Sequence, residues 1–285
     1  MSIRLENVSY RYLEDTPMET TALAEVNLEI GEGEFVGIIG PTGSGKSTLI
    51  QHFNGLLLPT SGKVWVDGVD LTHKDTQLRI IRQKVGMVFQ YPEHQLFGET
   101  VLEDVGFGPQ NGGLPAEEVE QRVRRALAYV GLDFEELKDQ SPFELSGGQK
   151  RRVAIAGVLA MEPSVLILDE PTAGLDPKGR EEILDEICAL HKERGITVIL
   201  VSHSMEDVAR LVDRLIVMDK GRVVLDGTPV EVFREADTLR ELGLGLPQVT
   251  ELMHELKAKG LAVNTDILTV EAAEEEIARV MGGQR

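Results

Sequence analysis

The segment Gly40 to Ser47 reads GPTGSGKS, and it stands between the apolar run Phe35 to Ile39 and the helical stretch TLIQHF at 48–53. This is the full GxxxxGK[ST] pattern in its strand, loop and helix setting, the most specific signal in the chain. Its glycines let backbone N–H groups turn around phosphates, and its lysine reaches the β and γ phosphates. We therefore predict a nucleoside triphosphate site. A glycine-rich turn that merely starts a helix is the less favoured alternative.

The residues predicted to contact the nucleotide, ATP, lie in this loop and at the start of its helix: Gly40, Pro41, Thr42, Gly43, Ser44, Gly45, Lys46, Ser47 and Thr48. The hydroxyl of Ser47 is also predicted to ligate Mg²⁺, which is the usual companion of a triphosphate.

Two carboxylates follow the apolar run Val165 to Leu168, at the edge of the sheet where the phosphates are expected. Asp169 is predicted to hold Mg²⁺ through water. Glu170 points the other way and is predicted to polarise the attacking water. The alternative for Glu170 is that it caps the turn at Pro171.

On both sides of this segment, short β-branched runs alternate with longer helical stretches. This alternation predicts an α/β fold with a RecA-like P-loop NTPase core. The predicted strands are Phe35 to Ile39, Val64 to Val66, Val85 to Phe89, Val165 to Leu168, Thr197 to Val201 and Leu215 to Met218. Asp67 with Gly68, and Lys220 with Gly221, are typical of hairpin turns and indicate an antiparallel β subdomain.

The strand signal stops over about 91–162, where Ala116 to Val130 and Lys150 to Ala160 have helical periodicity. We expect an ATPase domain over 1–227 with a helical insertion in this stretch. After Gly227 two apolar stripes at helical spacing predict a small helical extension over 228–285. The stripes consist of Val249, Leu252, Met253 and Leu256, and of Val270, Ala273, Ile277, Val280 and Met281.

The charge balance disfavours nucleic acid as a partner, because 29 Lys and Arg stand against 48 Asp and Glu, a net charge of −19. The N-terminus lacks the layout of a signal peptide, and no apolar run approaches the length of a membrane span. We expect a cytosolic chain.

A second predicted anion-binding helix start is LSGGQ at Leu145 to Gln149, which opens the helix Lys150 to Ala160. Free N–H groups, a hydroxyl and the positive end of the helix dipole would meet there. Taken alone, Ser-Gly-Gly before a helix is more often an ordinary N-cap.

The motif does not stand alone, since LSGGQ, LILDE at 166–170, AGLD at 173–176 and His203 occur in order. With these residues the chain resembles an ATP-binding-cassette nucleotide-binding domain over about Ile3 to Gly227. The resemblance implies a dimer in which the signature loop of one subunit closes over ATP on the P-loop of the other. The signature-loop residues it assigns to ATP are Ser146, Gly147, Gly148 and Gln149, with Ser146 and Gly148 on the γ phosphate.

The same resemblance implies four further roles. Gln90 is similar to the Q-loop glutamine that senses Mg²⁺ and the attacking water, and His203 to the switch histidine on the γ phosphate. Asp176 resembles the D-loop aspartate that crosses the dimer interface. Tyr12 resembles the aromatic that stacks on adenine, with Tyr10 as a competitor for that role.

The segment YPEHQLFGETVLEDVGFGP at 91–109 resembles the Q-loop region of energy-coupling factor (ECF) transporter ATPases, in the form of the second of their two types. This implies an importer of vitamins or transition-metal ions, with a second ATPase subunit, identical or similar, as one partner. The other implied partners are a transmembrane coupling subunit that binds a groove in the insertion and a substrate-binding membrane subunit. The chain would then lie at the cytoplasmic face of the membrane.

The stretch Gly243 to Gly260 also resembles that family's terminal extension, in which Leu246 and Pro247 would help to hold two ATPases together. A helix that packs on its own domain is an equal alternative. Two other functions stay open at this point: a soluble cassette protein with a regulatory or nucleic-acid-associated role, and a P-loop kinase.

Overall fold

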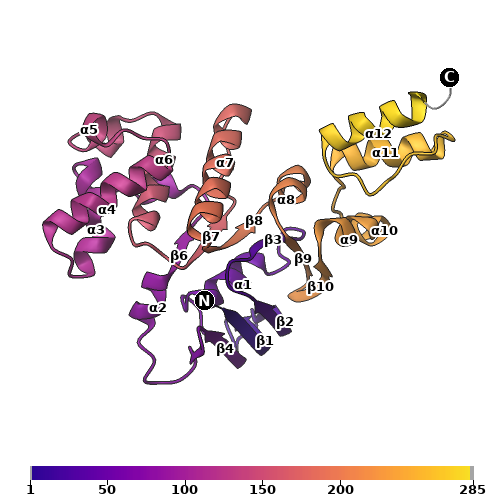
Figure 1. Ribbon diagram of the computed structural model, residues 1–285. Helices are drawn as coiled ribbons and strands as arrows, with labels where there is room; N and C mark the ends of the chain where they lie inside the picture. Colours follow the sequence, from indigo (N-terminus) through magenta and orange to yellow (C-terminus); the bar gives the residue numbers. More distant parts are fainter. Residues whose placement is uncertain (1, 283–285) are drawn as a thin grey trace.

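The computed structural model describes residues 2–282 and centres on a six-stranded sheet (Figure 1). Its strands, in spatial order, are β10 (Arg222–Gly227), β9 (Arg214–Asp219), β3 (Phe35–Ile39), β8 (Thr197–Val201), β7 (Val165–Asp169) and β6 (Val85–Val88). The strands from β9 to β6 are parallel, and β10 pairs antiparallel with β9. The predicted α/β class is confirmed.

Both faces of this sheet are covered over the inner strands β3, β8 and β7 and over β6, which explains why these four strands are buried along their length and largely apolar. Successive residues of β3 enter two different hydrophobic clusters. Val36 and Ile38 join the cluster that contains helix α1 (Lys46–Phe53), while Phe35 and Ile39 join the cluster beneath the other helices. The phosphate loop is thus held at the end of a strand that is buried on both sides.

A second, antiparallel sheet covers the outer side of α1 (Figure 1). Its strands in order are β2 (Thr20–Ile30), β1 (Ile3–Tyr12), β4 (Ser61–Val66) and β5 (Val69–Asp70). The long strands β1 and β2 were missing from the predicted set, because their apolar residues alternate with polar ones and form no continuous run.

Both predicted hairpin turns are present. Asp67 and Gly68 join β4 to β5, and Lys220 and Gly221 join β9 to β10. All four residues have positive φ, as tight two-residue turns require. The β9–β10 turn also meets its neighbours through the backbone: Gly221 N donates to Ser44 O at 2.9 Å, and Ala24 N donates to Gly221 O at 2.9 Å.

Helix α2 (Leu78–Lys84) leads into β6, and helices then replace strands up to β7. They are η1 (Pro92–Gln95), α3 (Val101–Asn111), α4 (Ala116–Tyr129), α5 (Phe134–Leu137), η2 (Pro142–Glu144) and α6 (Gly147–Leu159). Helix α6 begins three residues earlier than the predicted Lys150, because the two glycines of LSGGQ form its first turn behind the N-cap Ser146.

The remaining helices are α7 (Pro177–Arg194), α8 (Met205–Leu211), α9 (Pro229–Arg234), α10 (Ala236–Glu241), α11 (Gln248–Ala258) and α12 (Val270–Gly282). Over residues 2–282, none of the helices combines the length and the apolar character that crossing a bilayer requires. The end of the chain, α11 and α12, forms a small pair beside α9 and α10 (Figure 1).

The C-terminal pair has its own core of Met253, Val263, Ile267 and Ala273, and it is anchored to helices α8 and α9. Gln248 N donates to the Glu206 carboxylate of α8 at 3.3 Å, and Arg234 of α9 pairs with Asp266. Leu246 and Pro247 are buried in their own chain, with Leu246 in the main core. Their predicted contact with a second ATPase stays a prediction.

Candidate functional site

The phosphate loop has room only for glycine at two positions. Gly40 has φ 154°, and a Cβ there would lie 2.3 Å from Met218 O. Gly45 has φ 101°, and a Cβ there would lie 2.4 Å from Ala22 O. Because both clashes are with backbone atoms, the loop cannot relax around a side chain. The close approach of strands β9 and β2 therefore fixes the loop's shape.

The loop carries polar groups that suit an anion. The Lys46 ammonium donates to Gly40 O at 2.7 Å and Pro41 O at 3.1 Å, and burial lowers its pKa. The Ser44 hydroxyl is buried without a hydrogen-bond partner among the described residues. No side chain caps the first turn of α1, so its N–H groups face outward. A phosphate chain would satisfy all of these groups at once.

Asp169, at the end of β7, is almost fully buried. Burial raises the pKa of this carboxyl, and the nearby Ser47 hydroxyl opposes the rise. An alcohol oxygen and a buried carboxylate side by side are hard oxygen donors of the kind that Mg²⁺ prefers. The residues present therefore fit the predicted metal.

Glu170 has a left-handed backbone, with φ 50°, which is uncommon outside glycine and often marks a functional residue. Its carboxylate lies between two predicted partners. Gln90 Nε2 donates to Oε2 at 2.9 Å, and His203 Nε2 lies 2.7 Å from Oε1. The structure thus brings together the three residues predicted to be catalytic, beside a cavity of about 400 Å³ lined by Glu170 and His203.

The two candidate aromatics occupy different positions. Tyr12 is 40% exposed, and its hydroxyl lies 3.2 Å from the Thr48 hydroxyl of α1. Tyr10 lies behind it, in an edge contact with the Tyr12 ring at 4.9 Å between centroids, and burial raises the pKa of Tyr10. Of the two rings, Tyr12 is the one that is open to a base beside the phosphate loop.

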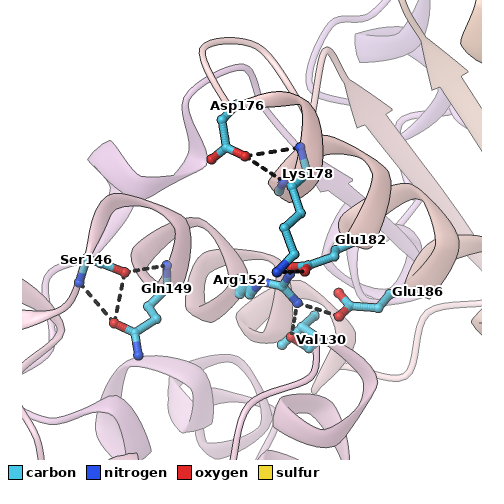
Figure 2. Close-up of polar contacts among 9 residues, drawn as sticks. Val130, Ser146, Gln149, Arg152, Asp176, Lys178, Glu182 and Glu186 are labelled. Atoms are coloured by element: carbon cyan, nitrogen blue, oxygen red, sulfur yellow. Dashed lines mark hydrogen bonds and ion pairs between the residues drawn. The ribbon is translucent and has the colours of Figure 1, made fainter.

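The predicted signature loop forms a complete helix start (Figure 2). The Ser146 hydroxyl accepts from Gln149 N at 3.3 Å, and Gln149 Oε1 accepts from Ser146 N at 3.1 Å, a capping box. A Cβ added at Gly147 or Gly148 would meet nothing within 4 Å. Packing inside this chain therefore does not demand glycine at either position, and this surface is open to an approaching group.

Asp176 caps helix α7, since its Oδ1 accepts from the backbone of Lys178 at 3.1 Å and of Gly179 at 3.0 Å (Figure 2). Arg152 of α6 donates to Val130 O at 2.7 Å and also pairs with Glu182 and Glu186 of α7. The Ser146 loop and the Asp176 loop are therefore fastened to one another through α6 and α7.

The structure does not bring the two predicted phosphate-binding loops together. In the part of the chain that the structure describes, no hydrogen bond or ion pair joins Gly40–Ser47 to Leu145–Gln149. Helix α6 lies among the insertion helices, away from α1 (Figure 1). One chain thus carries two half-sites.

A buried arginine near the site was missing from the predicted set. Arg151 is 2% exposed, and its guanidinium donates to both Glu93 oxygens, at 3.0 and 2.7 Å, and to Ala173 O. It thereby joins the segment after Gln90, helix α6 and the loop before Asp176. The two arginines after LSGGQ were the available signal, but a pairing across 58 residues has no local sequence pattern.

Comparisons with known proteins identify the family to which this chain is similar. The family model described as "ABC transporter" matches residues 23–173. The energy-coupling factor transporter ATP-binding protein EcfA2 of Clostridium tetani is 59% identical over 284 residues, covering 100% of this chain and 99% of that relative. The ECF resemblance predicted from the segment at 91–109 is confirmed.

Two solved structures of ATP-binding cassette proteins are similar to this chain in fold and sequence. CbiO1 from Clostridium perfringens, described as part of the ABC transporter complex cbiONQ, has a TM-score of 0.74 and 45% identity over 88% of this chain and 98% of that one. The ATP-binding cassette MJ0796, in a dimeric post-hydrolysis state bound to ADP and Pi, has a TM-score of 0.71 and 36% identity over 80% of this chain and 98% of that one.

Proposed function

The chain belongs to the ABC transporter family of ATPases, and from this premise we propose that it powers an ECF-type importer of vitamins or transition-metal ions from the cytoplasmic face of the membrane. It is an ATP-hydrolysing enzyme whose relatives carry the name of transporter subunits. Family membership leaves the P-loop kinase without support, and the relatives' names favour the importer over a regulatory or nucleic-acid-associated cassette.

The observation that carries the proposal is the separation of the two half-sites. The P-loop offers Lys46 and a free helix start, and the signature loop offers Ser146 with two open glycines. A second ATPase subunit, identical or similar, completes each site by placing its signature loop over the γ phosphate. ATP then favours the closed dimer, and hydrolysis removes the contacts that hold it.

The chain's own residues supply the hydrolytic step. The Glu170 carboxylate is oriented from both sides by the Gln90 amide and the His203 ring, so it is set to accept a proton from the attacking water. Ser47 and Asp169 are the residues that would hold Mg²⁺, which when bound neutralises charge on the β and γ phosphates. Asp176 remains the proposed D-loop contact across the interface.

An exposed aromatic pair on the insertion supports a membrane partner. Phe97 and Phe107 are 58% and 47% exposed, and their rings meet edge to face at 4.7 Å. The Asp104 carboxylate accepts from Phe97 N at 2.7 Å and fixes this segment. Since exposed apolar clusters mark interaction sites, we assign this face to the transmembrane coupling subunit, which in turn contacts the substrate-binding subunit.

Purification of the full chain from membranes of its own cells tests the proposal. The chain should be recovered with integral membrane proteins, and Phe107→Ser should lose them while it still binds ATP. Met18→Ser, which alters a 75% exposed side chain on the β1–β2 connection, is the control and should retain them. Recovery of only a homodimer that stimulates no uptake by the co-expressed membrane subunits would contradict the proposal.

A further inference from the structure

A closed circuit of four contacts, three between side chains and one with the Thr48 backbone carbonyl, begins and ends at Thr48, directly after the P-loop. The Thr48 carbonyl lies 2.7 Å from His52 Nδ1, and the His52 ring meets Tyr10 edge to face at 5.0 Å. Tyr10 meets Tyr12 in the same way at 4.9 Å, and the Tyr12 hydroxyl returns to the Thr48 hydroxyl at 3.2 Å. The circuit links α1 to the end of strand β1.

His52 is the fully buried member, with 0% of its surface exposed. Because its Nδ1 faces a carbonyl oxygen, this nitrogen carries the proton and donates. Its Nε2 is buried and has no hydrogen-bond partner among residues 2–282. Burial lowers the pKa of His52, and the Thr48 bond opposes this only in part, so the ring is neutral.

We propose that His52 is a positioning residue for adenine: acting through Tyr10, it holds the Tyr12 ring at the angle that receives the base. The proposal rests on the proposed function, in which Tyr12 is the stacking aromatic. His52 itself touches neither base nor phosphate, and its effect reaches the nucleotide only through the two tyrosines.

Strand pairing alone does not fix the Tyr12 ring. The β1–β2 ladder shifts register between Val8 and Tyr10 and again between Tyr10 and Arg11, shortly before the strand ends. The Tyr12 ring, 40% exposed, is therefore held mainly by its edge contact with Tyr10 and its hydroxyl contact with Thr48. An aromatic surface that is already oriented binds a base at lower entropic cost than a mobile one.

The circuit also fixes the spacing between the surface that receives the base and the loop that receives the phosphates. Thr48 follows Ser47, the predicted Mg²⁺ ligand, so the base platform and the phosphate loop are fastened to the same helical turn. A loosened circuit should therefore affect ligands that carry a base and spare those that carry only phosphates.

The test compares the affinities of the full-length chain for MgATP and for magnesium tripolyphosphate, which has the phosphates but no base. His52→Leu should weaken MgATP binding about three- to tenfold, as expected for the loss of one aromatic edge contact, and leave tripolyphosphate binding within about twofold. Tyr12→Ala should weaken MgATP binding about 5- to 150-fold with the same selectivity. In the Tyr12→Ala background, His52→Leu should add nothing.

His52→Phe should restore most of the MgATP affinity, because a phenyl ring retains the edge contact and replaces the unpartnered Nε2 by carbon. His191→Leu is the matched control. That ring has the same kind of Nδ1 contact, to Ile196 O at 2.8 Å, and an aromatic neighbour, Phe35, but it lies on α7. Both affinities should be unchanged in this variant.

Tyr10→Leu removes the middle ring of the circuit, on strand β1. If His52→Leu does not fold, the MgATP and tripolyphosphate affinities of Tyr10→Leu are compared in its place, with the same selective loss expected. A parallel loss of ATP and tripolyphosphate affinity, or no loss of either, would overturn the role of His52. If Tyr12→Ala lowers ATP affinity selectively while His52→Leu does not, this inference alone fails. If Lys46→Ala leaves ATP binding intact, the proposed nucleotide site itself fails.

Discussion

At the scale of single residues, Glu170 is held unusually firmly. Its backbone is left-handed, and each of its carboxylate oxygens has its own partner, Gln90 on one side and His203 on the other. A glutamine at this position keeps the size of the side chain and one oxygen that can accept from one of the two partners. Substitution by the isosteric amide therefore tests chemistry and not shape.

Glu170→Gln should bind MgATP with unchanged affinity and hydrolyse it at least about 100-fold more slowly, because the general base is lost. The unhydrolysed nucleotide should also make the closed dimer accumulate, which sedimentation in the presence of ATP would detect. Glu241→Gln, at the exposed end of α10, is the control and should hydrolyse at the normal rate. Normal turnover by Glu170→Gln would remove it from the role of base.

Site residues at the ends of apolar strands were predictable, and residues whose role depends on packing were not. Gln90, Glu170 and His203 each follow an apolar strand, and the parallel sheet brings those strand ends to one edge. The roles of His52 and Arg151 depend on what packs beside them in space. The motifs that precede these two residues mark where they stand in the chain but do not reveal their partners in space.

At the scale of elements, the chain offers two equivalent helix starts for comparison. Ser146 caps α6 and Thr228 caps α9, each in a capping box with the residue three positions on. Ser146→Ala and Thr228→Ala should each lower stability by about 1 kcal/mol in urea unfolding. Only Ser146→Ala should also lower kcat/KM for ATP, by roughly 10- to 150-fold, because it removes a hydrogen bond to a charged phosphate. Equal rates in the two variants would mean that Ser146 is only a cap.

The Arg151–Glu93 pair holds three elements together, so its loss should destabilise the whole insertion. Glu93→Gln leaves the buried guanidinium without its charge partner and should lower the unfolding free energy by about 3 kcal/mol at pH 7. Glu135→Gln, which alters an exposed pair with Arg124, is the control and should leave the unfolding midpoint in place.

The pH dependence of this effect has a definite sign. Burial alone would raise the pKa of Glu93, but its hydrogen bonds with Arg151 outweigh burial and lower it below the ordinary 4.5. The pair therefore contributes fully to the free energy of unfolding above pH 4.5. It loses this contribution as the pH falls through the lower pKa that Glu93 has in the folded state. The difference in unfolding free energy between the wild type and Glu93→Gln should shrink as the pH falls below 4.5. A difference that grows there would contradict the assignment.

At the scale of the whole molecule, the C-terminal pair α11 and α12 has a core of its own. Met253 is fully buried in that core, while the adjacent Leu252 is 46% exposed. Met253→Ala should lose about 2–5 kcal/mol of local stability, seen as faster hydrogen exchange in 248–282 with little change in β3. Leu252→Ala should leave exchange nearly as it is. Faster exchange throughout the chain would show that the pair is not a separate unit.

The overall architecture was predictable wherever burial on both faces makes a strand continuously apolar. The inner strands of the central sheet follow that rule, whereas β1 and β2 are covered on one face and alternate in polarity. The anchoring of Leu246 in the main core was not predictable, because an apolar stripe does not reveal whether its own chain or another one covers it.

The β9–β10 turn has a practical consequence for anyone who wishes to label this protein. Its backbone is hydrogen-bonded to the P-loop at Ser44 and to strand β2 at Ala24. A tag or epitope inserted at Lys220 would therefore break the hydrogen bonds between three segments that meet there. The exposed turn at 112–113, between α3 and α4, is the better place for an insertion, provided that Gly113, with φ 86°, is kept as glycine.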